Sequence, residues 1–175
     1  AMQTHCDSSR LQEAGLGTLS NLASDNNDRA AAIASVGGID AVLMGMGAHG
    51  ELVGVQQRGC GALANLAAGS EDRKEAITTA WGIKTVVRAM RTHRESVRVQ
   101  EQGCAALANL AVVSQTVRSD VSIPKPDDVR RKVIASEGGI EMVVAAMEAH
   151  GGSAKVQEYG AGVLRNLSAG SEDVR

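Results

Sequence analysis

The chain is almost without aromatic residues, with one Trp, one Tyr and no Phe among 175 residues. Its core must therefore be built from Leu, Val, Ile, Ala and Met. Such residues suit closely packed helices better than a β-sheet, in which aromatic and β-branched residues are enriched. The composition favours an all-α fold.

Other absences exclude other classes of protein. No apolar run reaches the roughly 18 residues of a membrane-spanning helix. The 18 basic and 20 acidic residues nearly balance, so the total charge gives no reason to expect nucleic acid or an anionic membrane as partner. Three cysteines without framework spacing are typical of a reducing compartment, which predicts a cytoplasmic or nuclear location. The polar start shows no signal peptide, and we interpret its Ala1–Met2 pair as an addition left by cloning.

What the chain does contain is an internal repeat. One motif occurs four times, as LQEAGLGTLSNLAS, VQQRGCGALANLAA, VQEQGCAALANLAV and VQEYGAGVLRNLSA. Its glutamine lies at positions 12, 56, 100 and 157, so the period is 44 residues and the last interval is longer by 13. A second block, GGIDAVLMGM, returns as WGIKTVVRAM and GGIEMVVAAM. A period of 44 residues is typical of helical solenoids.

The repeated motif has the periodicity of a helix. At 100° per residue, Val55, Gly59, Cys60 and Leu63 share one apolar side, and Gly61 lies on the opposite side. A glycine inside a helix costs about 0.5–1 kcal/mol relative to Ala. Its return on the apolar side therefore predicts tight packing between repeats, at Gly15, Gly59, Gly103 and Gly160.

Two glycine patterns, GCGALA and GMGAHG, superficially match a nucleotide-binding turn. That reading is poor, because no strand precedes either pattern and the glycines lie within or at the end of a helix. We expect no cofactor.

Each unit is expected to contain three helices. In the best-defined unit, Ser70 caps the first helix, Gly82 provides a sharp turn, a second helix covers roughly 83–93 and a third roughly 97–111. The predicted domain is single and spans 1–175, and we interpret it as a piece of a longer protein. It comprises a third-type helix at about 8–24, repeats at about 25–68, 69–111 and 112–169, and the start of a further repeat at 170–175.

A 13-residue insertion is placed near 113–127. Pro124 and Pro126 predict an exposed loop there, followed by a helix capped by Asp127 or Asp128. The insertion is either a tolerated surface loop or a functional one.

The ALANLA and VLRNLS endings, followed by a short helix and a Gly-Gly-Ile turn, resemble armadillo repeats such as those of importin-α and β-catenin. The resemblance covers nearly the whole chain, from about Leu11 to Arg175. It implies a right-handed α-solenoid of three-helix repeats. It also implies that the third helices line a concave surface, which in this family often binds extended peptides.

Under this resemblance, equivalent positions of the third helices form ladders. The first is an asparagine ladder of Asn21, Asn65, Asn109 and Asn166. A carboxamide can pair with one peptide group, so the ladder can clamp an extended partner segment. Alternatively, each Asn bonds a neighbouring loop or repeat, and both roles can hold. Four residues before each Asn, importin-like arrays often carry Trp, whereas this chain has Gly17, Gly61, Ala105 and Gly162. Binding of nuclear-localisation signals is therefore not expected.

Two charged ladders accompany the asparagines. Acidic or amide residues lie at Glu13, Gln57, Glu101 and Glu158, and the other row comprises Arg10, Gly54, Arg98 and Lys155. We expect pairing within each helix between residues three apart. The alternative is a groove for a mixed-charge peptide, with Tyr159 and Arg165 as a local hot spot.

The remaining candidates have structural explanations. Cys60 and Cys104 are expected to be buried, free thiols that act as small hydrophobic residues. His49, His93 and His150 each close a second helix, too far apart to share a metal. Trp81 replaces a turn glycine and either anchors a partner or packs over the turn.

The sequence thus predicts a protein-interaction module that is not an enzyme. It would bind a protein or peptide partner along the third helices, without catalytic residues, metal or small-molecule substrate. The alternative is a structural spacer or oligomerisation region, with self-association through uncapped ends.

Overall fold

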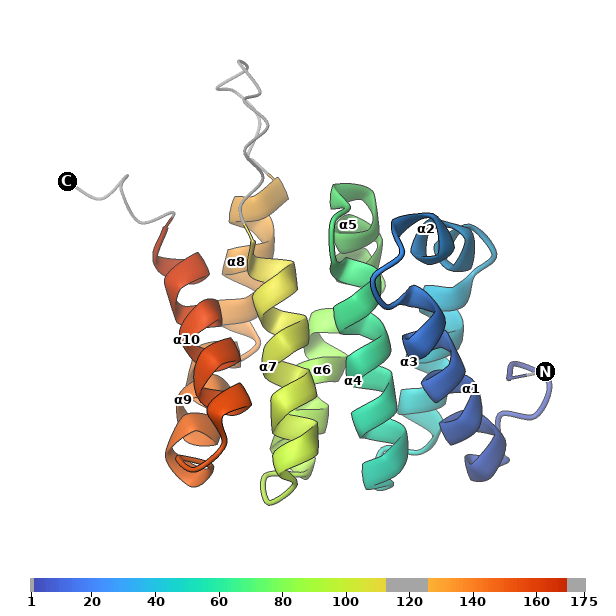
Figure 1. Ribbon diagram of the computed structural model, residues 1–175, viewed down its shortest axis with the longest axis horizontal. Coiled ribbons are helices and arrows are strands. Elements are labelled where there is room, and N and C mark those ends of the chain that lie inside the picture. The colour runs from blue at the N-terminus through green and yellow to red at the C-terminus, as the bar shows by residue number, and fades with distance from the viewer. Residues whose placement is uncertain (1, 113–125, 170–175) are drawn as a thin grey trace, which may run out of the picture.

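The computed structural model describes residues 2–112 and 126–169, which form ten α-helices and no strand (Figure 1). The predicted insertion near 113–127 lies almost wholly outside the described residues, and so does the expected start of a further repeat at 170–175. Within the described residues the all-α prediction is confirmed.

The helices follow one another in three types, as the 44-residue repeat predicts. The long third-type helices are α1 (Ser9–Ala23), α4 (Val53–Ala67), α7 (Val97–Ala111) and α10 (Ala154–Ser168). The first-type helices are α2 (Asn27–Ser35), α5 (Glu71–Thr79) and α8 (Pro126–Ser136). The second-type helices are α3 (Gly38–Ala48), α6 (Gly82–Thr92) and α9 (Gly139–Ala149).

Equivalent helices of successive repeats lie side by side. In Figure 1, α1, α4, α7 and α10 form a front layer, the second-type helices lie behind them, and the first-type helices cover one end. Each third-type helix packs against the next one along the chain. The molecule is an α-solenoid.

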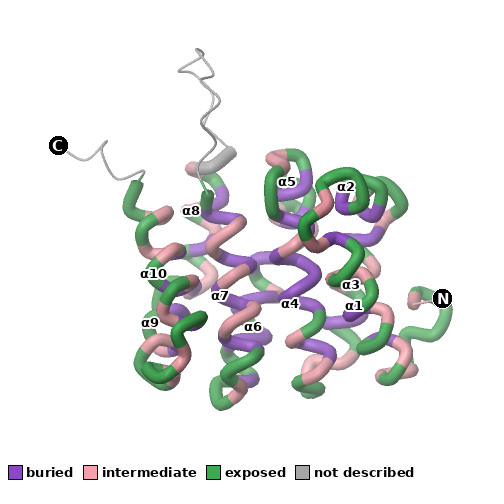
Figure 2. The backbone as a smooth tube through the Cα atoms, viewed as in Figure 1, coloured by how far each residue is buried: buried purple, intermediate pink, exposed green. Residues whose placement is uncertain are grey.

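The core is deepest in the two central third-type helices, which have neighbours on both sides (Figure 2). Leu63, Leu66, Leu107 and Leu110 are fully buried there. These leucines are the apolar positions of the repeated motif, which explains why the motif recurs: every interface between repeats needs the same apolar surface.

Helix starts follow local rules. The side chains of Ser8, Asn26, Ser70, Ser96 and Ser153 each accept a hydrogen bond from a backbone N–H in the first turn of the next helix. The predicted cap at Ser70 is confirmed. The expected cap at Asp127 or Asp128 is wrong, because α8 already begins at Pro126. Proline is tolerated at the first helical position, where its missing N–H would have no partner within the helix.

The turn between first-type and second-type helices needs a left-handed residue. Gly37 and Gly138 have φ of +79° and +80°, and Trp81 takes the same conformation at +65°. The turn in the middle repeat was expected from Gly82, but Gly82 is the first residue of α6. Trp81 therefore carries the backbone strain that glycine avoids in the other two repeats.

The interpretation of Ala1–Met2 as an added pair stays a prediction, but Met2 packs as a structural part of the first repeat. Met2 lies against Gly15, with its sulfur 2.6 Å from the place where a Cβ on Gly15 would stand. Gln12 Nε2 donates to the carbonyls of Met2 and His5, at 2.8 and 3.0 Å. These contacts are the same as those formed by the end of a second-type helix in the later repeats, so Met2 and His5 belong to the repeat pattern.

Among the described helices, none alone is long and apolar enough to cross a membrane. Only α2 and α3 taken together, bent by 74° against each other, meet that requirement.

Candidate interaction surface and repeat interfaces

The third-helix face is the side of α1, α4, α7 and α10 that points away from the second-type helices (Figure 1). All the predicted partner-binding residues lie on these four helices. Some of these side chains bond a neighbouring repeat, and others remain available to a partner.

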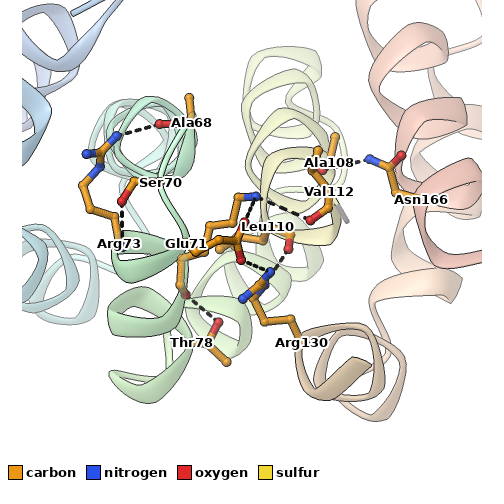
Figure 3. A network of polar contacts seen from close by, with 11 residues as sticks. Ala68, Ser70, Glu71, Arg73, Thr78, Ala108, Leu110, Val112, Arg130 and Asn166 are labelled. Atoms are coloured by element: carbon orange, nitrogen blue, oxygen red, sulfur yellow. Dashed lines mark hydrogen bonds and ion pairs between the residues drawn. The ribbon is translucent and has the colours of Figure 1, made fainter. Parts of the chain in front are cut away.

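The asparagine ladder joins the repeats. Asn65 Nδ2 donates to the Ser20 carbonyl at 2.8 Å, and Asn109 Nδ2 donates to the Ala64 carbonyl at 2.9 Å. In the last repeat, Asn166 Nδ2 donates to the carbonyl of Ala108 at 3.1 Å, as Figure 3 shows. Each acceptor belongs to the preceding third-type helix. One of the two predicted roles of the ladder, bonding to a neighbouring repeat, is therefore present.

Asn21 occupies the same position in α1 and is exposed. It forms no side-chain hydrogen bond within the described part of the chain. For the later asparagines, the amide nitrogen is committed to the neighbouring helix, whereas the amide oxygen accepts no hydrogen bond from the described residues. That the asparagines hold a partner segment stays a prediction. Only their amide oxygens, as acceptors, remain available for this role.

The glycines of the packed side have a different partner from the one expected. A Cβ on Gly59 would lie 2.3 Å from Met46 Cγ, and one on Gly103 would lie 2.5 Å from Met90 Cγ. Met46 and Met90 come from α3 and α6, the helices that directly precede α4 and α7 in the chain. The close approach predicted between repeats is thus one between second and third helices within a repeat.

The bare position on the third-helix face is covered by side chains of the following helix. The Arg58 side chain crosses Gly17, with its Cδ 3.5 Å from a Cβ built there, and the Gln102 amide lies over Gly61. Gly61 is buried as a result. The space that relatives with Trp would fill is therefore partly filled by Arg58 and Gln102.

The predicted pairing within helices is wrong. Of the residues that the structure describes, Arg10–Glu13, Arg98–Glu101 and Lys155–Glu158 form no ion pairs.

The acidic residues turn instead toward the next helix. Glu13 lies against Gly54 of α4, 2.5 Å from where a Cβ would stand, and Glu101 accepts a hydrogen bond from Ser153 Oγ at 2.8 Å. Adjacent third-type helices lie close enough that each acid contacts the next repeat and not the cation three residues away in its own helix.

The glutamine that served only to align the repeats has a structural role that its recurrence did not reveal. Gln56 Nε2 donates to the carbonyls of Met46 and His49 at 2.9 and 3.0 Å, and Gln100 Nε2 does the same with Met90 and His93. Each glutamine thereby satisfies two carbonyls at the end of the preceding second-type helix. Its strict position in every copy indicates that a role exists, and the contacts identify that role.

The histidines form a second ladder between repeats. Nε2 of His49, His93 and His150 lies 2.7–2.8 Å from a backbone oxygen of the preceding repeat. A carbonyl oxygen only accepts, so Nε2 carries the proton in each ring. Among the described residues, no three His, Cys, Asp or Glu side chains are grouped to hold a metal ion.

A third set of bonds between repeats involves arginines that the sequence reading missed. Arg73 Nε donates to the Leu66 carbonyl at 2.6 Å, and Arg130 Nε donates to the Leu110 carbonyl at 3.0 Å. Arg130 also bonds Glu71 at 2.6 Å, and Lys74 bonds the same carboxylate at 2.7 Å (Figure 3). These arginines close the ends of the third-type helices, whose last carbonyls have no partner within the helix.

Glu71 is the acidic centre of that network. Burial alone would raise the pKa of Glu71, but the hydrogen bonds and positive charges of Lys74 and Arg130 outweigh it and hold the pKa below the usual value. Because Arg130 and Lys74 are buried, the carboxylate supplies the charge that their burial requires.

The cysteine prediction is confirmed. Cys60 and Cys104 are free and fully buried, and burial raises the pKa of both thiols to about 12, with their mutual proximity contributing at Cys60. They behave as small apolar side chains.

The singular side chains differ in exposure. Tyr159 is half-buried against the core, whereas Arg165 is exposed. Trp81 is 68% exposed, with Lys84 Nζ 5.7 Å from its ring centre, so it does not pack over its turn.

The three-helix repeats, the bonds between equivalent helices and the recurring glycines define an armadillo-type α-solenoid. A family model described as the LRRK2 ARM repeat matches residues 1–175, and the chain belongs to this family. ARM repeat domains are generally non-catalytic scaffolds that bind protein partners.

Two crystal structures of engineered proteins from the Northeast Structural Genomics Consortium have the same fold. The first has a TM-score of 0.74 at 24% identity, covering 93% of this chain and 58% of the engineered one. The second has a TM-score of 0.58 at 19% identity, with 97% and 79% covered. The chain thus spans little more than half of the first engineered protein. No curated protein matches the sequence.

Proposed function

We propose that the chain binds an extended segment of a partner protein along the third-helix face. The observation that supports this most directly is the orientation of the asparagine ladder. A hydrogen bond to the preceding helix fixes each of Asn65, Asn109 and Asn166 through its nitrogen, which leaves a positioned amide oxygen on every repeat.

The spacing of these oxygens suits an extended chain. Packed helices lie about 8–10 Å apart, and an extended segment rises about 3.3 Å per residue. Every third backbone N–H of a bound segment would therefore meet one amide oxygen, and about nine residues would span the four helices. A fixed acceptor loses little conformational entropy on binding, which favours this use.

The test is a selection followed by matched variants. Random peptides of about nine residues, displayed on phage, are selected on the intact chain. Selected peptides are then measured by fluorescence anisotropy against Asn65→Ala/Asn109→Ala and against His93→Ala/His150→Ala. Both pairs remove hydrogen bonds to two carbonyls of a preceding repeat, and the asparagine pair also removes a longer bond to Ser20 Oγ. The histidines bond at the ends of the second-type helices. Circular dichroism establishes that each variant is folded.

We expect the asparagine pair to weaken binding by roughly tenfold and the histidine pair to leave it nearly unchanged. Equal affinity in the folded asparagine variant would overturn the proposal. The spacer alternative predicts a different pattern: no peptide is retained, and light scattering shows assemblies that grow with concentration.

A further inference from the structure

The third-helix face presents one exposed cation within the first two turns of each of its four helices. This basic row comprises Arg10, Arg58, Arg98 and Lys155. Within the described part of the chain, none of these four side chains forms an ion pair or donates a hydrogen bond. The row is therefore a stripe of cations that have no ion pairs among the described residues, and it crosses every repeat.

Two of the three acids beside the row, Glu13 and Glu101, contact the next helix instead. Glu13 lies on the first turn of α4 at Gly54, and Glu101 accepts the Ser153 hydroxyl at the start of α10. The second position of the acidic ladder is an amide, Gln57. Only Glu158 is both exposed and without a contact among the described residues. The stacking of repeats thus gives Glu13 and Glu101 contacts other than the cation one turn away.

The row widens into a hollow between α1 and α4. This hollow has a volume of about 400 Å³, and its polar lining includes two cations, Arg10 and Arg58, one acid, Glu13, and Asn21. The Arg58 stem lies directly on Gly17, with its Cδ and Nε 3.5 and 3.6 Å from where a Cβ would stand. The missing side chain at Gly17 therefore leaves Arg58 room to lie across the α1 backbone, beside the hollow that Arg10 also lines.

We propose that the bound segment is acidic, with carboxylates that pair with the basic row at about every third residue. The inference rests on the proposed function, because it names the chemistry of the segment on the same face. Guanidinium groups bind carboxylates in a planar, two-bonded geometry. A segment with one acid in three would place one carboxylate per helix, since the helices lie about 8–10 Å apart and an extended chain rises about 3.3 Å per residue.

The experiment uses defined probes. Fluorescein-labelled peptides of about nine residues, built from Gly-Glu-Ser, Gly-Gln-Ser or Gly-Lys-Ser repeats, are titrated with the intact chain. The variants are Arg58→Ala/Arg98→Ala and a control with the same change of net charge, Arg29→Ala/Lys132→Ala. Arg29 and Lys132 are exposed on first-type helices and lie off the third-helix face.

We expect the Glu peptide to bind at least several-fold tighter than the Gln peptide, and the Lys peptide not to bind. Arg58→Ala/Arg98→Ala should weaken the Glu peptide by roughly three- to tenfold, and Arg29→Ala/Lys132→Ala by less than about twofold. Added salt should reduce the difference between the two double variants, because the pairs are exposed.

Equal binding of the Glu and Gln peptides would overturn the inference, and so would equal losses in the two double variants. Failure of the acidic-segment inference can be distinguished from failure of the proposed segment-binding function. If phage-selected peptides require Asn65 and Asn109 but contain no excess of Asp or Glu, the segment-binding function stands and the acidic partner is wrong. If no peptide depends on either set of residues, both proposals are wrong.

Discussion

The GCG of the repeated motif places two glycines in two different regions of the molecule. Gly59 lies on the packed side, where a Cβ would meet Met46 at 2.3 Å. The second glycine of the motif, Gly61 in GCG and Gly17 in the first copy, lies on the third-helix face. A Cβ on Gly17 would meet the Arg58 side chain at an ordinary 3.5 Å, whereas one on Gly61 would meet the flexible end of Gln102 at 2.9 Å. The packed side is thus constrained by its own core, and the third-helix face leaves room for residues that act on a partner.

The largest expected difference between the two regions concerns these glycines. Gly59→Ala should lower the free energy of unfolding by about 1–3 kcal/mol, because buried Met46 must move. Gly17→Ala should leave it unchanged or raise it by up to about 1 kcal/mol, since alanine is the better helix former. Urea unfolding followed by circular dichroism measures both. Similar unfolding free energies of the two variants would show that the packed side is no more sensitive to an added Cβ than the third-helix face.

A smaller effect is expected for the asparagine ladder, which belongs to both regions. Asn109→Ala removes a bond between repeats and should cost about 1 kcal/mol of unfolding free energy. Asn21→Ala provides the matched control, because Asn21 forms no side-chain hydrogen bond among the described residues, and its change should be near zero. The same urea experiment applies. A loss at Asn21 as large as at Asn109 would show that the bond between repeats is not the cause.

The subtlest comparison is between a paired and an unpaired acid. The pKa of Glu71 is lowered in the folded state, so its stabilising contribution is fully present above the unfolded value of about 4.3 and is lost as pH falls through the folded value. Glu71→Gln should be less stable than the wild type at pH 7 and should lose less stability on acidification. Glu158→Gln removes an exposed acid that has no contact among the described residues, so it is the control for the change of charge, and its stability at pH 7 should equal that of the wild type.

Urea midpoints recorded from neutral pH to about pH 3 measure this difference. An identical acid dependence for Glu71→Gln and the wild type would show that the pairing with Lys74 and Arg130 adds no stability.

Much of the fold was predictable because it is repeated and local. Four copies of one motif defined the period, the apolar side of the third helices and the burial of Cys60 and Cys104. The cap at Ser70 follows from the chemistry of a single helix start. The predicted third helix at roughly 97–111 agrees with α7, Val97–Ala111.

The candidate site was less predictable. The repeat register shows which residues lie on the third-helix face, but it does not show which neighbouring groups their side chains contact. Glu101 has Arg98 one turn away in its own helix, yet it bonds Ser153 of the next repeat. Arg73 and Arg130 lie outside the four aligned motifs, yet both bond the last turn of a neighbouring third-type helix. Trp81 takes a backbone conformation that no propensity would assign to it.

By itself, the sequence determined the all-α class, the 44-residue repeat, the armadillo resemblance and the residues that occupy each ladder. These depend on periodicity and on helix ends, and both act over a few neighbouring residues. Only the tertiary structure decided that Gly59 accommodates Met46 and that the asparagine nitrogens bond the preceding third-type helix. It also decided that the basic row forms no ion pairs among the described residues. A side chain on a helix surface can reach its own helix or the next one, and the spacing of the stacked repeats selects between them.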